Sequence, residues 1–202
     1  MGALLRVGVL LSGSGTNLQA IIDSSGSDYD VVVVVSDKPD AFGLERARTA
    51  GVPAVHVDPK AHDGREAFNE ALADMLRAHD VELVCLAGFM RILAPNLVKA
   101  FENRILNIHP ALLPAFPGAH AVRDALDWGA KVTGTTVHLV DEEVDHGPIL
   151  LQRAVPIERG DTEEMLHERI KSVEHELYPE AIRLFATGRV RVEGRRVVVE
   201  KA

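Results

Sequence analysis

The sequence predicts an α/β protein built on a doubly wound, mostly parallel sheet with an antiparallel C-terminal margin. Strand-like and helix-like segments alternate from the first residues to Ala87, residues 31–35 are five consecutive valines, and the second half departs from the alternation. Uninterrupted β-branched runs are typical of strands buried on both faces of a parallel sheet. Strand, helix, strand order favours right-handed crossovers within such a sheet.

In the first half, short apolar runs alternate with stretches whose apolar residues recur at helical spacing. Phe68, Leu72 and Leu76 show this spacing most clearly. Gly51 ends the preceding predicted helix, at 42–50. The pattern predicts strands at 4–11, 31–35, 52–57 and 81–87, and helices at 18–22, 42–50 and 65–78.

The second half is expected to hold fewer crossovers. Its patterns predict strands at 104–109, 131–140 and 148–157, helices at 121–128 and 162–187, and a hairpin at 189–200 that turns at Glu193-Gly194. A break of the long helix near Tyr178-Pro179 is the alternative, because proline removes a helical hydrogen bond. Since no linker, repeat or low-complexity segment interrupts the chain, one domain over 1–202 is expected.

Composition limits the function classes. Of 202 residues, 22 are Lys or Arg and 30 are Asp or Glu, a net charge of −8, which argues against the basic surface that a nucleic-acid partner requires. Cys85 is the lone cysteine, so no intramolecular disulfide can form, and a cytosolic location is expected. Between Arg104 and Arg123 the charge-free stretch contains three prolines, so no membrane span is expected there. A monomer or homodimer acting on small molecules fits best.

The glycine-rich segment from Ser12 to Asn17 links the first strand to its helix. Glycines allow a tight turn, and amides at a helix start favour a phosphate. The alternative is a plain turn in which Ser14 or Thr16 caps the helix. The segment lacks the lysine of a Walker loop, and Leu18 stands where a dinucleotide motif has its third glycine.

Two further segments carry polar groups suited to chemistry. Asn107 and His109 lie two apart on a predicted strand, so they project together and could stabilise a developing oxyanion and manage a proton. Two polar residues that merely close a strand are the alternative. The segment 141–148 is rich in acids, yet its spacing matches no regular zinc or calcium pattern, so solvated surface is expected and no metal. Cys85 is expected in the core, whereas His138 could face core, solvent or site.

Read together, six segments resemble the phosphoribosylglycinamide formyltransferase family of purine biosynthesis: LLSGSGTNLQAII, AFGLERA, LAGFMRIL, ILNIHPALLPAFPGAH, GTTVHLV and DEEVDHGPIL. They run in order from about Leu4 to Tyr178. The resemblance implies the formyltransferase fold, with a Rossmann-like phosphate-binding half at 1–103 and a catalytic and folate-binding half at 104–202. It also implies transfer of the formyl group of 10-formyltetrahydrofolate, the co-substrate, to the amine of 5'-phosphoribosylglycinamide.

The same resemblance assigns site residues. It implies catalytic roles for Asn107, His109 and Asp145. For the glycinamide ribonucleotide it implies contacts with Ser14, Gly15, Thr16, Asn17 and Glu174. For the folate it implies contacts with Arg65, Met90, Arg91, Ile92, Leu93, Asn107, Asp141, Glu142, Glu143, Val144 and Asp145, while His120 and His138 match histidines that line the site.

The expected chemistry needs no enzymic nucleophile, because the substrate's amine attacks. Asn107 and a protonated His109 would donate to the tetrahedral oxyanion. Asp145 would favour the imidazolium by its charge and order a water that carries a proton to the leaving nitrogen. A cis peptide bond is expected at Leu113-Pro114, where the loop bends tightly.

Four alternatives remain at this point. Methionyl-tRNA formyltransferases and formyltetrahydrofolate hydrolases share the catalytic core but are expected to be longer at one end, and the Ser12 to Asn17 segment favours a phosphorylated acceptor over water. A nucleotide-binding oxidoreductase would use the same first turn and an acid after the second strand, a position that Asp37 could fill. A ligand-binding module without catalysis would have no use for Asn107, His109 and Asp145.

Overall fold

A computed structural model describes residues 3–200, so the first two and last two residues of the predicted 1–202 domain lie outside it. Seven strands form one sheet in the order β3-β2-β1-β4-β5-β6-β7, and β8 and β9 form a separate hairpin. The strands are β1 (Leu5–Leu11), β2 (Tyr29–Ser36), β3 (Ala54–His56), β4 (Leu83–Leu86), β5 (Ile105–His109), β6 (Val132–Leu139), β7 (Ile149–Pro156), β8 (Val190–Glu193) and β9 (Arg196–Val199). The helices are α1 (Thr16–Asp23), α2 (Phe42–Thr49), η1 (Pro59–Ala61), α3 (Gly64–Ala78), α4 (Pro95–Ala100), α5 (Ala121–Asp127) and α6 (Glu163–Ala186).

The predicted doubly wound sheet is confirmed. Strands β1 to β5 pair in parallel, whereas β6 runs antiparallel to both β5 and β7. The chain leaves β1 toward one edge and returns through β4 toward the other, so the order reverses between β1 and β4. Ligands of such sheets bind outside the carboxyl ends of the strands at this reversal. The segments that follow β1 and β4 therefore frame the candidate site.

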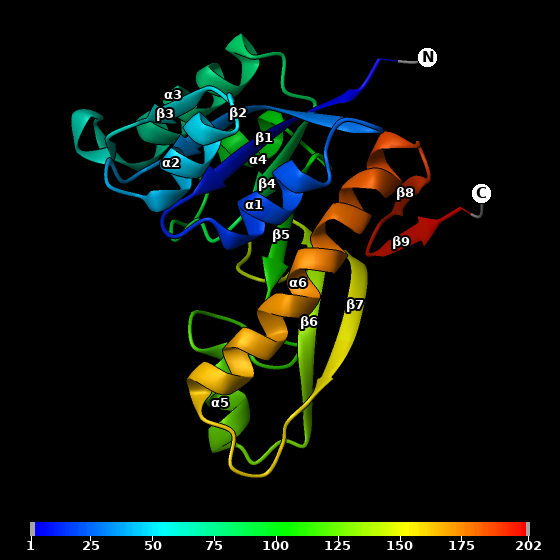
Figure 1. Cartoon of the computed structure of the whole chain (residues 1–202). Helices are drawn as coiled ribbons and strands as arrows, with labels where there is room; N and C mark the ends of the chain where they lie inside the picture. The colour runs from blue at the N-terminus through cyan, green and yellow to red at the C-terminus, as the bar shows by residue number, and fades with distance from the viewer. Residues whose placement is uncertain (1–2, 201–202) are drawn as a thin grey trace.

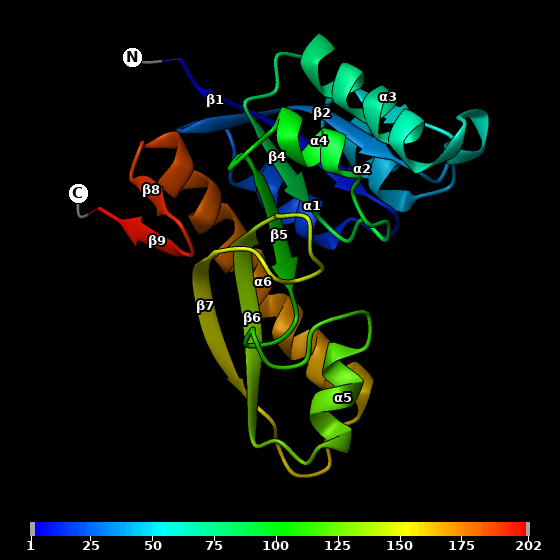
Figure 2. The same ribbon diagram turned by 180° about the vertical axis from the view of Figure 1, so that it is seen from behind.

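Helices cover both faces of the sheet. Helices α1, α2 and α6 bury Leu18, Leu44 and Tyr178 against one face, and α3 and α4 bury Leu72 and Leu97 against the other. Figure 1 shows the first layer in front of the sheet, and Figure 2 shows α3 and α4 from behind. The sheet is thus dry on both faces over β1, β2 and β4, which explains the five consecutive valines at 31–35 in β2.

The long strands β6 and β7 extend away from the parallel part, with α6 lying along them and α5 at their far end (Figures 1 and 2). There a small second core joins Val122, Val155, Leu166 and Ile170. The antiparallel margin therefore forms an arm that starts at β5, the strand carrying Asn107 and His109.

The structure excludes one alternative and corrects the sequence reading in two places. Helix α6 runs unbroken through Pro179, because Tyr178 beside it is buried and its hydroxyl donates to the carbonyls of Leu86 and Leu106. The short helices η1 and α4 were not predicted, since each is too brief to show a period. Strand β3 is only three residues long. Within residues 3–200, no helix is long and apolar enough to cross a membrane.

Candidate active site

The segment after β1 is a tight turn held by α2. Gly15 has a positive φ of 71°, and a Cβ there would lie 2.7 Å from Gly43 Cα, so α2 packs against it too closely for a side chain. Arg46 Nε of α2 donates to Ser14 O at 2.8 Å. The first-turn amides of α1 lack partners within the helix. The turn therefore presents amides and a positive helix end, as an anion site requires.

A buried carboxyl faces this turn from α6. Asn17 Nδ2 donates to Glu174 Oε2 at 2.9 Å, and Glu174 is only 4% exposed. Burial raises the pKa of Glu174 against the opposing hydrogen bond from Asn17. Asn17 Oδ1 is buried and has no partner. Two of the predicted substrate contacts, 157 positions apart, are thus brought together with an unused polar atom between them.

The segment after β4 lies beside the turn. Met90 N donates to Ser12 Oγ at 2.9 Å, which ties the two predicted substrate segments together. Arg91 Nε donates to the buried Asp37 at 2.7 Å, and its guanidinium lies 5.6 Å from the Phe68 ring. Asp37 therefore holds Arg91 and is already engaged, which weighs against its use as the ribose-binding acid of an oxidoreductase.

Arg65 is the second residue of α3, and its side chain is exposed. Asn69 of α3, which is 1% exposed, connects the start of this helix to the end of the segment after β4. Its Nδ2 donates to Arg65 O at 2.8 Å and its Oδ1 accepts from Ala94 N at 3.0 Å. This buried amide fixes the start of α3 to the end of the Met90 to Leu93 segment.

Strands β5 and β6 place Asn107 directly opposite His138. Asn107 Nδ2 lies 3.1 Å from His138 Nε2, and His138 Nδ1 lies 2.8 Å from Leu139 O. Because a carbonyl only accepts, Nδ1 carries the proton and Nε2 accepts from the amide. His138 is 2% exposed and so faces the site from within the core.

His109 lies between two oxygen acceptors. Its Nε2 is 2.8 Å from Phe116 O, and its Nδ1 is 3.4 Å from Asp145 Oδ2. Asp145 also accepts from Gly118 N at 2.8 Å, and its Oδ1 lies 3.8 Å from His138 Nε2. Phe116 and Asp145 have φ of 51° and 52°, a region that side chains adopt only when their surroundings impose it.

The charge state of this cluster differs from the sequence expectation. Burial lowers the pKa of His109 and outweighs the Phe116 hydrogen bond and the Asp145 charge, which raise it. Burial raises the pKa of Asp145, but the hydrogen bond from Gly118 N and the neighbouring imidazoles of His138 and His109 lower it overall. The free site therefore favours a neutral His109 beside an ionised Asp145, because burial destabilises the imidazolium more than the single carboxylate stabilises it.

The two segments expected to bind folate each carry exposed apolar side chains. Met90, Ile92 and Val144 are 71%, 56% and 53% exposed, whereas Leu93 is buried. Glu142 and Glu143 point to solvent, and Asp141 is half-buried. Isolated apolar side chains on a surface are ordinary, but three on the segments that follow β4 and β6 suit a flat, partly apolar ligand.

Known proteins identify the family. A family model described as formyl transferase matches residues 5–182. The phosphoribosylglycinamide formyltransferase of Escherichia coli is 45% identical over 93% of this chain and 90% of its own length. The crystal structure of glycinamide ribonucleotide transformylase 1 from Symbiobacterium toebii is 58% identical, covers 100% of this chain and 96% of that one, and superposes with a TM-score of 0.97. This chain belongs to the phosphoribosylglycinamide formyltransferase family.

Some relatives are much longer. The trifunctional purine biosynthetic protein adenosine-3 of Bos taurus is 48% identical over 93% of this chain but only 19% of its own length. The chain therefore spans about a fifth of such relatives. The match to this family confirms the resemblance read from the six sequence segments.

Several residues of this formyltransferase site gave no sequence signal. Thr136 lies opposite His109, donates to Ala111 O at 2.6 Å and accepts from Leu113 N at 3.1 Å. Gln152 of β7 donates to Thr136 Oγ1 and to Leu113 O. They fix the loop that carries Phe116 and Gly118. Alternation along GTTVHLV was the signal available for Thr136, but Gln152 depends on the β6 and β7 register.

The remaining predictions have mixed outcomes. The cis bond at Leu113-Pro114 is confirmed. Cys85 is fully buried in the core, and burial raises the pKa of its thiol, so it is no nucleophile. His120 is the exposed N-cap residue of α5 and caps no amide there. Among residues 3–200, no cluster of three His, Cys, Asp or Glu side chains could hold a metal ion.

Proposed function

We propose that this chain transfers the formyl group of 10-formyltetrahydrofolate to the amine of 5'-phosphoribosylglycinamide, which yields N-formylglycinamide ribonucleotide and tetrahydrofolate. The observation that carries the proposal is the convergence of Asn107, His109 and Asp145 at the end of β5. They lie beside the reversal point of the sheet. There Ser12 connects the turn after β1, which suits an anion, to the segment 90–93 after β4.

The glycinamide ribonucleotide would bind with its phosphate on the amides of Ser14 to Asn17. Glu174 and the unpartnered Asn17 Oδ1 would then meet its polar sugar or glycinamide groups. Backbone amides bind an anion locally, so the net charge of −8 is no obstacle. This placement aims the substrate's amine along the sheet toward β5.

The folate would lie between residues 90–93 and 141–145. Met90, Ile92 and Val144 would contact its pterin ring, and Arg65 would pair with its acidic tail. Arg91 supports this site indirectly, because Asp37 holds its guanidinium. In this scheme the phosphate-binding half at 1–103 also supplies part of the folate site, and the catalytic half at 104–202 supplies the rest.

The reaction would begin when the amine attacks the formyl carbon and forms a tetrahedral oxyanion. Asn107 Nδ2 would donate to that oxygen, and so would His109 Nδ1 once it is protonated, while His109 Nε2 keeps its contact with Phe116 O. The developing negative charge, added to that of Asp145, would raise the pKa of His109 against the effect of burial and so favour a proton on His109 at this stage. The amine then loses a proton, and the folate nitrogen leaves with one. Asp145 would order the water between them.

The test follows the absorbance change as 10-formyltetrahydrofolate is deformylated, with and without glycinamide ribonucleotide. Turnover that requires the acceptor, with one formyl group gained per folate lost, supports the proposal. Turnover without the acceptor would identify a hydrolase instead. Binding of folate with no turnover would indicate a ligand-binding module. Tight binding of NADH without binding of folate would indicate an oxidoreductase.

The proposal includes a cytosolic protein that acts on free small molecules as a monomer or homodimer. Its support is limited to composition: an acidic charge balance and the single buried Cys85. Size-exclusion chromatography with light scattering would distinguish the two assembly states.

A further inference from the structure

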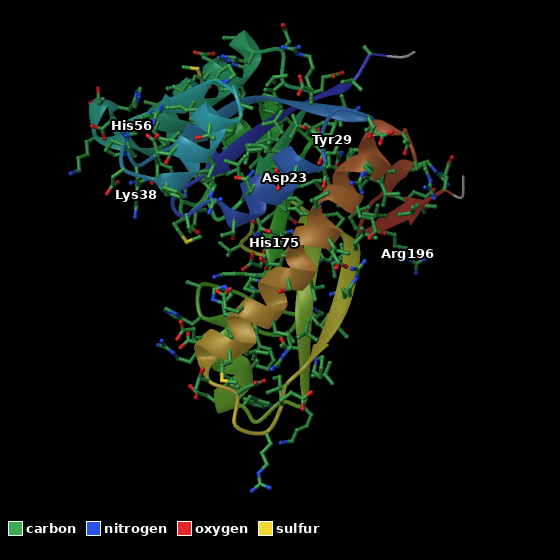
Figure 3. The ribbon with its side chains drawn as sticks, in the orientation of Figure 1. Asp23, Tyr29, Lys38, His56, His175 and Arg196 are labelled. Carbon is green, nitrogen blue, oxygen red and sulfur yellow. The ribbon has the colours of Figure 1, made fainter. Side chains whose placement is uncertain are left out.

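The C-terminal hairpin of β8 and β9 reaches the loop that carries Asp145. Its valines at 190, 192, 197 and 199 pack on the main core next to Leu151 of β7. Figure 2 shows the hairpin beside the end of β7 from which this loop departs, and Figure 3 labels Arg196 at its outer side. Its turn, at Gly194 and Arg195, is thereby held against residues 141–147.

Arg195 contacts His146 in two ways. Its Nη2 donates to His146 O, and its Nη1 lies 3.1 Å from Nε2 and 3.4 Å from Nδ1 of the ring. The two ring nitrogens point in different directions, so an atom this close to both lies over the ring face. A guanidinium stacks readily on such a face while it donates in its own plane.

His146 passes the contact into the loop. Its Nδ1 lies 2.8 Å from Asp141 Oδ2, and Asp141 Oδ1 accepts from Glu143 N at 3.0 Å. The carboxylate can only accept, so Nδ1 is the donor. Arg195, His146 and Asp141 therefore form one chain of contacts from the hairpin turn to the first residue of the loop.

The chain of contacts bears directly on Asp145. This residue holds a left-handed φ of 52° and is the neighbour of His146, whose carbonyl Arg195 fixes. On its other side Gly118 N donates to its carboxylate. A side chain in this backbone region keeps its place only where several neighbours determine it.

We infer that Arg195 is a positioning residue for the formyltransferase reaction. Acting through His146 and Asp141, it holds the 141–147 loop in the conformation that presents Asp145 to His109 and a folate edge to the co-substrate. Only the part of this inference that concerns folate rests on the proposed function. The loop contacts stand without it.

The first test measures amide hydrogen exchange. In Arg195→Ala, amides of 142–147 should exchange about three- to tenfold faster, the change expected when hydrogen bonds of ordinary net strength are lost. Amides of β8 and β9 should be unchanged. The matched control is Arg191→Ala, which removes the same charge from the same hairpin but contacts Glu193 and Glu200 within it. Unchanged exchange at 142–147 in Arg195→Ala would overturn the inference, as would equal acceleration in Arg191→Ala.

The second test is kinetic. Arg195→Ala should raise KM for 10-formyltetrahydrofolate and lower kcat, each by about three- to tenfold, with KM for glycinamide ribonucleotide changed by less than about twofold. Arg195→Lys, which keeps the charge but not the planar stack, should restore only part of the loss. His146→Ala should give the same defect, and the double variant no more.

The outcomes separate the two proposals. A wild-type chain that transfers no formyl group would refute the proposed function, while the exchange comparison would still decide the role of Arg195. Equal increases in both KM values, or additive losses in the double variant, would refute positioning of the folate loop through His146.

Discussion

Asn107 and His138 face each other across the antiparallel pairing of β5 with β6, with the Asn107 amide 3.1 Å from His138 Nε2. The amide has a second hydrogen, so the contact orients the group without consuming it. An amide that we propose to be catalytic, and that would otherwise rotate, is thereby fixed by a buried neighbour, which is the preorganisation that oxyanion stabilisation requires.

The first prediction concerns Asn107 itself. Asn107→Ala should lower kcat by about 10²–10³, the usual effect of losing one oxyanion donor, with little change in either KM. Steady-state kinetics measures this. Asn96→Ala is the matched control, because Asn96 donates to Glu66 O on α3 and should leave kcat near normal. An Asn107→Ala enzyme with near-normal turnover would sink the assignment.

The second prediction concerns His138 as the partner of Asn107. His138→Leu removes the acceptor and should lower kcat by about tenfold, whereas His138→Gln retains one and should lose less. In the Asn107→Ala background, His138→Leu should have almost no further effect, because the group that it orients is gone. Fully additive losses would show that His138 acts on its own.

The third prediction concerns stability and pH. The folded chain holds the pKa of His109 below its ordinary value of 6.5 because of burial, so unfolding takes up a proton below that pH. The stability due to the neutral ring is fully present above about pH 6.5 and is lost as the pH falls toward the folded pKa. The melting temperature of the wild type should therefore fall more between about pH 7.5 and about pH 5.5 than the melting temperature of His109→Asn.

Other groups do not confound this comparison. The pKa of Asp145 is also lowered, but its ordinary value of 3.8 puts its titration below the window. Burial lowers the pKa of His167 and His175 as well, and both remain in the variant. Parallel pH profiles for the two proteins would contradict the prediction.

The fourth prediction compares two glycines of one turn. Gly15→Ala should lower the free energy of unfolding by about 1–3 kcal/mol, because its φ is 71° and its Cβ would meet Gly43. Gly13→Ala should change it by no more than about 0.5 kcal/mol, since a Cβ there meets nothing within 4 Å. Urea denaturation of both variants provides the measurement. Equal losses would show that close packing of α2 is not what requires glycine.

Much of the fold was predictable, because apolar spacing is a local property. The strand starts and the helices α2, α3, α5 and α6 fall within a few residues of the predictions. The short α4 was missed because six residues show no period. The long helix predicted at 162–187 is confirmed, and its alternative, a break at Pro179, is excluded. The buried Tyr178 anchors α6 to the core, a tertiary effect that overrides the local cost of proline.

The candidate site was predictable in part for a similar reason. Asn107 and His109 share a strand, so their common direction follows from the two-residue repeat. Asp145 came from the family resemblance, and nothing in its own segment gave its left-handed backbone or its contact with Gly118. Asn69 and Gln152 carried no recognisable motif, and Thr136 lay within GTTVHLV with no role assigned to it, because all three join segments that are distant in the chain.

By itself, then, the sequence determined the order of elements, the fold class and the family, since each depends on patterns within short segments. Only the tertiary structure decided that Asn107 meets His138, that burial lowers the pKa of His109, and that Arg195 of the last hairpin covers His146. Those facts depend on strand order, register and solvent exclusion. Each arises between residues that the chain separates by many positions, where no local pattern operates.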